Sequence, residues 1–204
     1  MSLYKGFVYL HDYDDSIKFD IRYATSNNFI GRPLAGYQAN VCIVTKELAK
    51  ILVDLQAHLK TKNLELMIYE SYRPQRASED ILQWCQDLND QKNKLEYYPN
   101  VDKCDFYQQQ YILHHSGHTR GSTLDLTLLD RKTDLPLNMG SCFDFFGELS
   151  HPGNKNVPIE VYENRQYLQN LMQRYGFTGI HTEWWHFTLD NEPFPDTYFD
   201  FPVK

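Results

Sequence analysis

The sequence is poor in cysteine and has no long apolar run. Its four cysteines, Cys42, Cys85, Cys104 and Cys142, lie far apart, so the chain contains no Cys-x-x-Cys pair. Such pairs are typical of redox motifs and zinc ribbons, and both are therefore excluded. No stretch approaches the roughly 20 consecutive apolar residues that a membrane-spanning helix needs. We expect four free thiols and no interaction with a membrane.

Basic residues are also scarce. The chain has 20 Lys and Arg against 27 Asp and Glu, which gives a formal net charge of -7. Binding to nucleic acid through phosphate neutralisation needs the opposite sign, so nucleic acid is not an expected partner. The first residues lack a basic segment followed by an apolar one, so we expect no secretory signal and a cytoplasmic location. A periplasmic location is the alternative if a leader was removed from the natural N-terminus.

The rest of the composition is that of a globular protein. Hydrophobic residues make up 42% of the 204 residues, which is enough to bury a large core. Glycine and proline are spread along the chain and no internal repeat occurs, so nothing marks a linker. We expect residues 1–204 to form a single domain.

Apolar periodicity predicts two helices and a strand in the first half of the chain. Leucines recur at three- and four-residue spacing over residues 45–60, which predicts an amphipathic helix with Thr45 as its N-cap. Apolar residues then alternate over residues 64–68, as they do in a strand. A second helix is expected over residues 74–85, because proline is tolerated in the first helical turn. Arg73 should therefore lie at a strand-to-helix junction.

The second half shows the same mixture of periodicities. Leucines alternate with polar residues over residues 124–128, which predicts a strand with Asp125 on the face opposite the leucines. A third helix is expected over residues 160–175, where Gly176 follows as its C-terminal glycine. Residues 180–189 are rich in aromatic and β-favouring types. Together these elements predict an α+β fold with a central, mostly antiparallel sheet flanked by helices.

Two short segments hold residues that are typical of a catalytic metal site. His118 precedes Asp125 by seven residues with Gly121 between them, and His186 lies in the later segment Glu-Trp-Trp-His. A catalytic zinc ion needs about three nitrogen or oxygen ligands from the protein and one open position. Two histidines and one aspartate are a sufficient set. The sequence therefore predicts a Zn²⁺ site on His118, Asp125 and His186.

Two further residues suit hydrolysis beside such a metal. Glu183 lies three residues before His186 and is our candidate general base. A regular strand would point these two side chains to opposite faces, so the backbone must bend or bulge between them. Arg73 is the candidate for stabilising negative charge on a carbonyl oxygen, because its guanidinium is planar and always charged.

The remaining candidates have simpler explanations. Most histidines in globular proteins are surface or core residues without a metal. We assign no ligand role to the other six, which are His11, His58, His114, His115, His151 and His181. Trp184 and Trp185 are expected to pack in the core. Arg73 taken alone would be a surface ion pair, and the joint zinc site is therefore a hypothesis that depends on the whole set.

The same residues carry a resemblance to a known family. Residues 116–125 are similar to the motif S-x-H-x-x-G-x-x-x-D, and residues 183–186 are similar to E-W-W-H. Residues 72–74 match Y-R-P, and residues 23–31 resemble Y-A-T-x-x-N-F-x-G. These are motifs of the D-alanyl-D-alanine dipeptidases of the VanX type, which belong to peptidase family M15. The resemblance covers essentially the whole chain.

The resemblance implies a function and a role for each site residue. It implies zinc-dependent hydrolysis of D-alanyl-D-alanine to two D-alanines, in cell-wall precursor or peptidoglycan fragment metabolism. Zinc would lie on the three ligands named above, with Glu183 as catalytic base and Arg73 as transition-state stabiliser. The resemblance further implies that Asp144, Ser116 and Tyr23 bind substrate, with Asp144 holding the free amino group.

One departure from the family and two alternative functions stay open. The family commonly has D-G-Y-R-P where this chain has Glu70 and Ser71 before Tyr-Arg-Pro, so its dipeptide preference is expected to differ. One alternative is a zinc DD-carboxypeptidase that acts on longer cell-wall peptides, although Asp144 as a block at the amino end argues against it. The other is a non-catalytic zinc-binding recognition module, which would need neither Glu183 nor Arg73. The oligomeric state is not indicated.

Overall fold

The computed structural model describes residues 3–109 and 111–204. Within them, the main sheet has six strands in the order β2-β4-β5-β8-β7, with β6 paired to β5. All of its strand pairs are antiparallel except β2 with β4, which confirms the predicted α+β fold with a mostly antiparallel sheet. The strands are β2 (Lys18–Phe19), β4 (Leu64–Glu70), β5 (Thr123–Asp130), β6 (Leu135–Pro136), β7 (Phe177–Gly179) and β8 (His186–Leu189).

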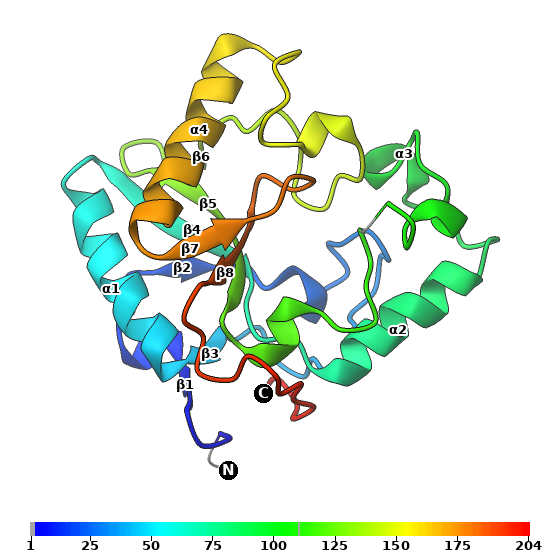
Figure 1. The fold of residues 1–204 in the computed structure, drawn as a ribbon, viewed down its shortest axis with the longest axis horizontal. Coiled ribbons are helices and arrows are strands. Elements are labelled where there is room, and N and C mark those ends of the chain that lie inside the picture. Colours follow the sequence, from blue (N-terminus) through cyan, green and yellow to red (C-terminus); the bar gives the residue numbers. More distant parts are fainter. Residues whose placement is uncertain (1–2, 110) are drawn as a thin grey trace.

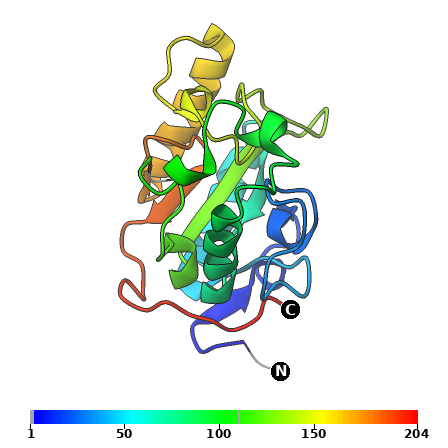
Figure 2. The same cartoon turned by 90° about the vertical axis from the view of Figure 1, so that its right-hand side faces the viewer.

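Helices cover both faces of this sheet. They are α1 (Lys46–Lys60), α2 (Gln75–Gln86), α3 (Lys94–Tyr97) and α4 (Ile159–Arg174). Figures 1 and 2 show α1 and α4 on one side of the sheet, and α2 and α3 with long loops on the other. A small second sheet pairs β1 (Phe7–Tyr9) with β3 (Ile43–Thr45). None of the helices in the described ranges is long and apolar enough to cross a membrane.

The predicted helices form close to their expected bounds. The leucines of α1 are fully buried, in keeping with the predicted amphipathic face. Thr45 occupies the N-cap position of α1, but the prediction that its side chain caps the helix is wrong. Its hydroxyl instead lies 2.7 Å from the Ser122 hydroxyl, so it joins the end of β3 to the residue before β5. The predicted third helix ends one residue early, and Gly176 follows with a φ of 80°.

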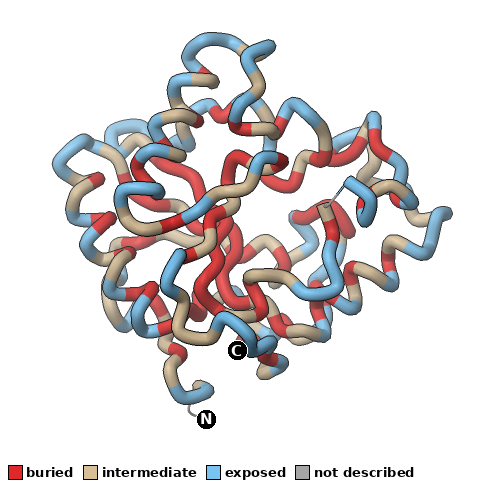
Figure 3. Tube along the Cα trace, in the orientation of Figure 1, coloured by how far each residue is buried: buried red, intermediate tan, exposed pale blue. Residues whose placement is uncertain are grey.

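The central strand β5 is buried on both faces. Its leucines at 124, 126 and 128 are inaccessible, as the alternating pattern predicts. The opposite face, with Thr123, Asp125 and Thr127, is buried as well. Figure 3 shows the buried segments gathered along these central strands, with exposed residues in the surrounding loops and helices. Asp125 is therefore an enclosed carboxylate and not a solvent-facing residue of a half-exposed strand.

A bulge in β4 places a polar residue beside Asp125. Ile68 pairs with Leu126 and Glu70 pairs with Asp125, so Tyr69 is an extra residue in the ladder. Asp125 in turn pairs with His186 of β8 on its other side. Glu70, Asp125 and His186 therefore lie in one row across three neighbouring strands. No periodicity in the sequence of β4 indicates this bulge.

Short 3₁₀ helices join the remaining segments. They are η1 (Leu10–Asp12), η2 (Arg22–Ala24), η3 (Lys103–Asp105), η4 (Gly117–Arg120) and η5 (Glu148–Ser150). In the segment after η2, the Asn28 side chain donates to the carbonyls of Thr25 at 2.7 Å and Arg32 at 2.9 Å. This asparagine therefore organises the loop that follows Tyr23. All four cysteines are free thiols, as expected.

Candidate active site

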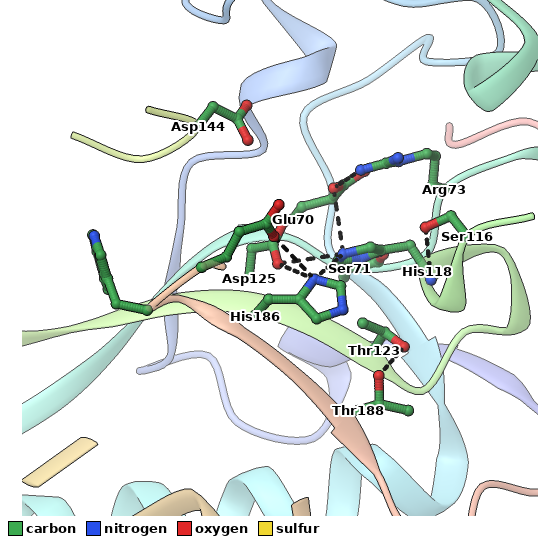
Figure 4. A network of polar contacts seen from close by, with 12 residues as sticks. Glu70, Ser71, Arg73, Ser116, His118, Thr123, Asp125, Asp144, His186 and Thr188 are labelled. Atoms are coloured by element: carbon green, nitrogen blue, oxygen red, sulfur yellow. Dashed lines mark hydrogen bonds and ion pairs between the residues drawn. The ribbon is translucent and has the colours of Figure 1, made fainter. Parts of the chain in front are cut away.

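The three predicted metal ligands converge on one point. The Asp125 Oδ1 atom lies 3.3 Å from His118 Nε2 and 3.0 Å from His186 Nδ1. The same two ring nitrogens are 3.3 Å apart. Figure 4 shows the three side chains pointing toward one another from η4, β5 and β8. Asp125 and His186 are direct partners in the sheet ladder, so backbone pairing sets their spacing.

Local turn chemistry brings His118 to the same place. The Ser116 hydroxyl accepts a hydrogen bond from the His118 backbone N–H at 3.3 Å, which caps η4. This helix ends at Gly121, whose φ of 84° favours glycine. A Cβ atom at Gly121 would lie 2.1 Å from Phe7 Cε1, so no larger residue fits there. The chain can therefore turn sharply from His118 into β5.

A backbone carbonyl fixes the orientation of the His118 ring. Its Nδ1 donates to the Ser71 carbonyl at 2.9 Å, because a carbonyl can only accept. The Nε2 lone pair is then free to face Asp125 and His186. Two imidazole nitrogens and one carboxylate oxygen, with one imidazole oriented from behind, are a donor set that fits Zn²⁺.

Opposite charges keep Asp125 ionised despite its burial. Burial acts to raise the pKa of Asp125, but His118 and His186 hold this pKa well below its usual value. Burial likewise acts to lower the pKa of His118, and the charges of Asp125 and Glu70 more than offset this, so the His118 pKa is raised. The cluster therefore offers a metal cation an ionised oxygen ligand.

Glu183 lies beside the cluster on an irregular turn. Its Oε2 atom is 3.7 Å from His186 Nδ1, and β8 begins only at His186. The bend that the sequence required between these two residues is therefore present. Burial, together with the charges of Asp125 and Glu70, raises the pKa of Glu183 to about 7. The intervening Trp184 and Trp185 are buried in the core, as predicted.

Arg73 lies at the junction between β4 and α2, as predicted, but in a buried ion pair. Its Nε donates to Glu70 Oε1 at 2.6 Å, and its Nη2 donates to Glu70 Oε2 at 2.5 Å. Glu70 is fully buried and also accepts a 3.0 Å hydrogen bond from the Tyr37 hydroxyl. Burial acts to lower the Arg73 pKa, but Glu70 more than offsets this effect and raises it. The guanidinium is therefore charged and held in a fixed plane.

Sequence reasoning missed this support for Arg73. In the sequence, Glu70 stands out only as a departure from the family motif, and nothing there signals its bidentate pair with Arg73. Tyr37 lies 33 residues from Glu70 along the chain, so no local spacing links the two. The Ser71 carbonyl that orients His118 was also missed, because a backbone group carries no residue signature.

Asp144 faces the same cavity from a separate loop. It is buried, and its Oδ2 accepts a 2.9 Å hydrogen bond from the Tyr23 hydroxyl. Figure 4 shows Asp144 set apart from the side chains around Asp125. Burial is the main cause that raises the pKa of Asp144 well above its usual value, and the nearby carboxylates add to it. A cation that binds beside Asp144 would favour its ionised form.

All eight residues proposed from the sequence line one cavity of about 200 Å³. This volume is below the roughly 300–1,000 Å³ of pockets for drug-sized ligands, which favours a small ligand. Three carboxyl groups and one guanidinium face the cavity. A cation that enters would favour the ionised forms of the carboxyl groups. His181, to which we assigned no ligand role, also lines it but lies outside the metal cluster. The apolar part of the wall includes Phe29, Ile81, Tyr111, Ile112, Phe146 and Ile180.

Comparisons with known proteins show the family of the chain. The D-ala-D-ala dipeptidase model of the M15 peptidases matches residues 4–204. The chain is 38% identical to the D-alanyl-D-alanine dipeptidase of Enterococcus faecium over 199 residues, which is 98% of each chain. It is also 38% identical to the D-alanyl-D-alanine dipeptidase of Streptomyces coelicolor, over 97% of this chain and 98% of that one.

A solved structure shows a weaker likeness. It is a variant of the vancomycin-resistance D,D-pentapeptidase VanY in complex with Zn(II), with a TM-score of 0.42 and 16% identity. The match covers 76% of this chain and 77% of that one. The match to the family model and the two full-length relatives show the family by themselves. The chain belongs to the D-Ala-D-Ala dipeptidase family of the M15 peptidases.

Proposed function

We propose that this chain is a zinc-dependent dipeptidase that hydrolyses D-alanyl-D-alanine to two D-alanines. The observation that carries the proposal is that one small cavity has two chemically different walls. One wall presents the convergent atoms of His118, Asp125 and His186. The other presents the buried carboxylate of Asp144. A dipeptide with a free amino group supplies a scissile carbonyl for the first wall and a cation for the second.

Zinc would be held by His118 Nε2, His186 Nδ1 and an oxygen of Asp125. When bound, it supplies a Lewis acid that polarises a carbonyl and acidifies water. The Ser71 carbonyl supports this role, since it holds the His118 ring with Nε2 toward the other two ligands.

Glu183 is the proposed general base. Its carboxylate lies next to the ligand cluster, where it can take a proton from the attacking water and later pass it to the leaving amine. Arg73 is the proposed stabiliser of negative charge that develops on the carbonyl oxygen. Its bidentate pair with Glu70 limits its motion, so little reorganisation is needed during the reaction.

The proposed substrate contacts divide between the two ends of the cavity. Asp144 would pair with the substrate ammonium, and the Tyr23 hydroxyl holds that carboxylate in place. Ser116 lines the cavity beside His118 and offers a hydroxyl to the bound dipeptide. A substrate that lacks the ammonium leaves a buried carboxylate unpaired, which gives strong discrimination.

We further propose that the enzyme works in the cytoplasm, on cell-wall precursors or peptidoglycan fragments. The four free thiols support a reducing compartment. Fractionation of cells that produce the natural full-length protein tests this location, and recovery with periplasmic markers would contradict it.

The test of the function is D-alanine release from D-Ala-D-Ala by zinc-loaded protein. A chelator-treated sample and N-acetyl-D-Ala-D-Ala run beside it. We expect chelator-sensitive cleavage of the free dipeptide alone. Cleavage of the acetylated substrate would favour a carboxypeptidase instead. Zinc binding without release from either substrate would reject the dipeptidase and favour a recognition module or a dipeptide preference shifted by Glu70 and Ser71.

A single variant separates the base from the metal site. Replacing Glu183 with Ala should leave stoichiometric zinc, because Glu183 is not one of the proposed ligands. Turnover should fall by about 10²-fold or more, since general acid–base catalysis contributes about 10²–10⁴-fold. Metal analysis and D-alanine release measure the two effects, and retained activity would remove Glu183 as the base.

A further inference from the structure

The loop that carries Asp144 has no regular strand to hold it. Residues 139–151, which we call the Asp144 loop, connect β6 to the segment before α4 and include η5. Asp144 has a φ of 62°, a left-handed conformation that costs free energy in residues other than glycine. Gly140 and Gly147 adopt positive φ on either side of it. Something outside the loop must therefore support its shape.

Arg165 of α4 binds the loop at both ends. Its Nε donates to the Met139 carbonyl at 2.7 Å, where the loop begins. Its Nη1 donates to the His151 carbonyl at 3.0 Å, and its Nη2 donates to the Leu149 carbonyl at 2.6 Å, where the loop ends. One planar side chain thus joins the start of the loop to its finish.

This arginine is unusual because, among the described residues, no carboxylate forms an ion pair with it. It is fully buried, and in the described part of the chain its partners are backbone carbonyls. Burial lowers the pKa of Arg165 to about 10, so it remains a cation at neutral pH. Burying a charge without an opposite charge is costly unless its hydrogen bonds are well satisfied. A specific role in closing the loop accounts for its place there.

A second set of contacts carries this constraint toward Asp144. The Ser150 hydroxyl donates to the carbonyl of Phe145, the residue after Asp144, at 2.6 Å. The Ser150 hydroxyl also lies 2.9 Å from that of Ser141. Ser141 in turn accepts a 2.9 Å hydrogen bond from the indole of Trp184. The loop is therefore fixed at its base by Arg165 and tied across to the segment that contains Glu183.

We propose that Arg165 is a positioning residue for recognition of the substrate's amino group. It lies outside the cavity and acts through the Asp144 loop, which it holds so that Asp144 meets both the Tyr23 hydroxyl and the substrate ammonium. The inference rests on the proposed dipeptidase function and deepens it. Lysine cannot replace this arginine, because a single ammonium cannot reach the three carbonyls in one plane.

The test compares Arg165→Lys with the wild-type zinc enzyme. We measure kcat and KM for D-Ala-D-Ala, the inhibition constant of N-acetyl-D-Ala-D-Ala, and bound zinc. KM for the free dipeptide should rise by about tenfold or more, since a misplacement of about 1 Å can cost about 10²-fold. The inhibition constant, kcat and zinc content should stay within about twofold of the wild-type values, because the metal ligands, Glu183 and Arg73 lie outside the Asp144 loop.

Two matched variants separate positioning from general loss of stability. Leu168→Ala removes a fully buried side chain from the same helix but leaves the Arg165 contacts in place. It should lower the thermal midpoint without changing KM. Ser150→Ala removes the inner hydrogen bond to Phe145 and keeps the buried charge, so it should raise KM in the same direction as Arg165→Lys. Ser150→Ala also keeps the proposal testable if Arg165→Lys does not fold.

Amide hydrogen exchange gives a readout that does not depend on turnover. In Arg165→Lys, exchange should become faster within the Asp144 loop and stay unchanged in β5. Unchanged KM in both loop variants, or an equal rise in KM in Leu168→Ala, would overturn the positioning role alone. Failure of the wild-type enzyme to release D-alanine would overturn the proposed function and this inference together, so the two failures are distinguishable.

Discussion

The two walls of the cavity are built in different ways. The metal wall, formed by His118, Asp125 and His186, rests on paired strands, and two of its ligands are cross-strand neighbours. The amine wall, formed by Tyr23 and Asp144, rests on the short 3₁₀ helix η2 and on the Asp144 loop, which the Arg165 side chain holds through backbone carbonyls. Strand pairing fixes distances within narrow limits, whereas a loop can change shape without disturbing the sheet. Bond cleavage and recognition of the amino group are therefore supported by separate parts of the fold.

The largest expected effect on activity comes from a substitution in the metal wall. Replacing His118 with Ala should remove zinc and lower D-alanine release by about 10³-fold or more, because the Lewis acid is worth several kcal/mol. Metal analysis and the release assay measure both effects. His114→Ala is the matched control, since His114 is exposed, lies four residues earlier and is outside the cluster. Zinc retention in His118→Ala would contradict the ligand assignment.

The next largest effect is on stability, and it comes from a substitution in the turn between His118 and β5. Gly121→Ala forces a Cβ atom against Phe7 in a left-handed conformation. We expect the free energy of unfolding to fall by about 2–5 kcal/mol, from backbone strain and overpacking together. Urea denaturation measures it. In Gly153→Ala the new Cβ meets nothing within 4 Å, so this control should change stability little. Equal stability of the two variants would show that the turn tolerates a side chain.

A smaller and more selective effect should come from the amine wall. Asp144→Asn removes the charge but keeps the shape, so kcat/KM for D-Ala-D-Ala should fall by about 10²-fold, from a charged hydrogen bond worth about 1.5–3 kcal/mol. Zinc content should not change, and the inhibition constant of N-acetyl-D-Ala-D-Ala should not rise, because Asp144→Asn leaves no buried carboxylate unpaired beside the acetyl group. Loss of zinc in this variant would mean that the two walls are not separate.

The smallest effect lies at the outer edge of the amine wall. Asp80 of α2 accepts two hydrogen bonds from Arg32 at 2.6 and 2.7 Å, which ties the loop after Tyr23 to that helix. The Arg32 hydrogen bonds lower the pKa of Asp80, so its stabilisation is present above the unfolded pKa and is lost as pH falls through the folded pKa.

Asp80→Asn should therefore matter only where the carboxylate is ionised. We expect a loss of about 0.5–1 kcal/mol at pH 7, reduced by solvent screening of the half-exposed Arg32. The difference from wild type should shrink as the pH falls below about 3.9, the usual pKa of an unfolded aspartate. Urea unfolding at neutral and acid pH measures the gap, and a gap that widens in acid would contradict the assignment.

Much of the fold and the cavity follows from local sequence. The helices follow from apolar spacing, and the turn at Gly121 follows from its position between His118 and Asp125. All eight residues proposed from motifs line the cavity, although their roles stay predictions. Backbone geometry accounts for the helices, the strands and the turn, because it sets the relative positions of residues a few places apart. Tyr23, Ser116 and Asp144 are proposed only from the resemblance to the dipeptidase family, since spacing alone does not indicate a substrate-binding role for them.

The supports behind these residues could not be predicted in the same way. Glu70 meets Tyr37, and Arg165 meets Met139, only because the whole chain folds between them. A helical arginine among polar neighbours is usually solvent-exposed, so nothing in the sequence marks Arg165 as buried. Thr45 shows the converse error. It has the residue type and position of a helix cap, but its hydroxyl finds a partner in Ser122, the residue before β5.

The bulge in β4 gives neighbouring residues access to different walls. Glu70 faces Asp125, while the ring of Tyr69 packs on Phe143, the residue before Asp144, with centroids 5.0 Å apart. A strand shortened by Tyr69 would still place its glutamate opposite Asp125 in a regular ladder, and would lose the contacts of the Tyr69 ring with Phe143 and with the Arg22 guanidinium. Insertion or deletion of one residue at position 69 can therefore change the surroundings of Asp144, and with them the choice of substrate. The pairing of Glu70 with Asp125 beside the predicted metal ligands would stay the same.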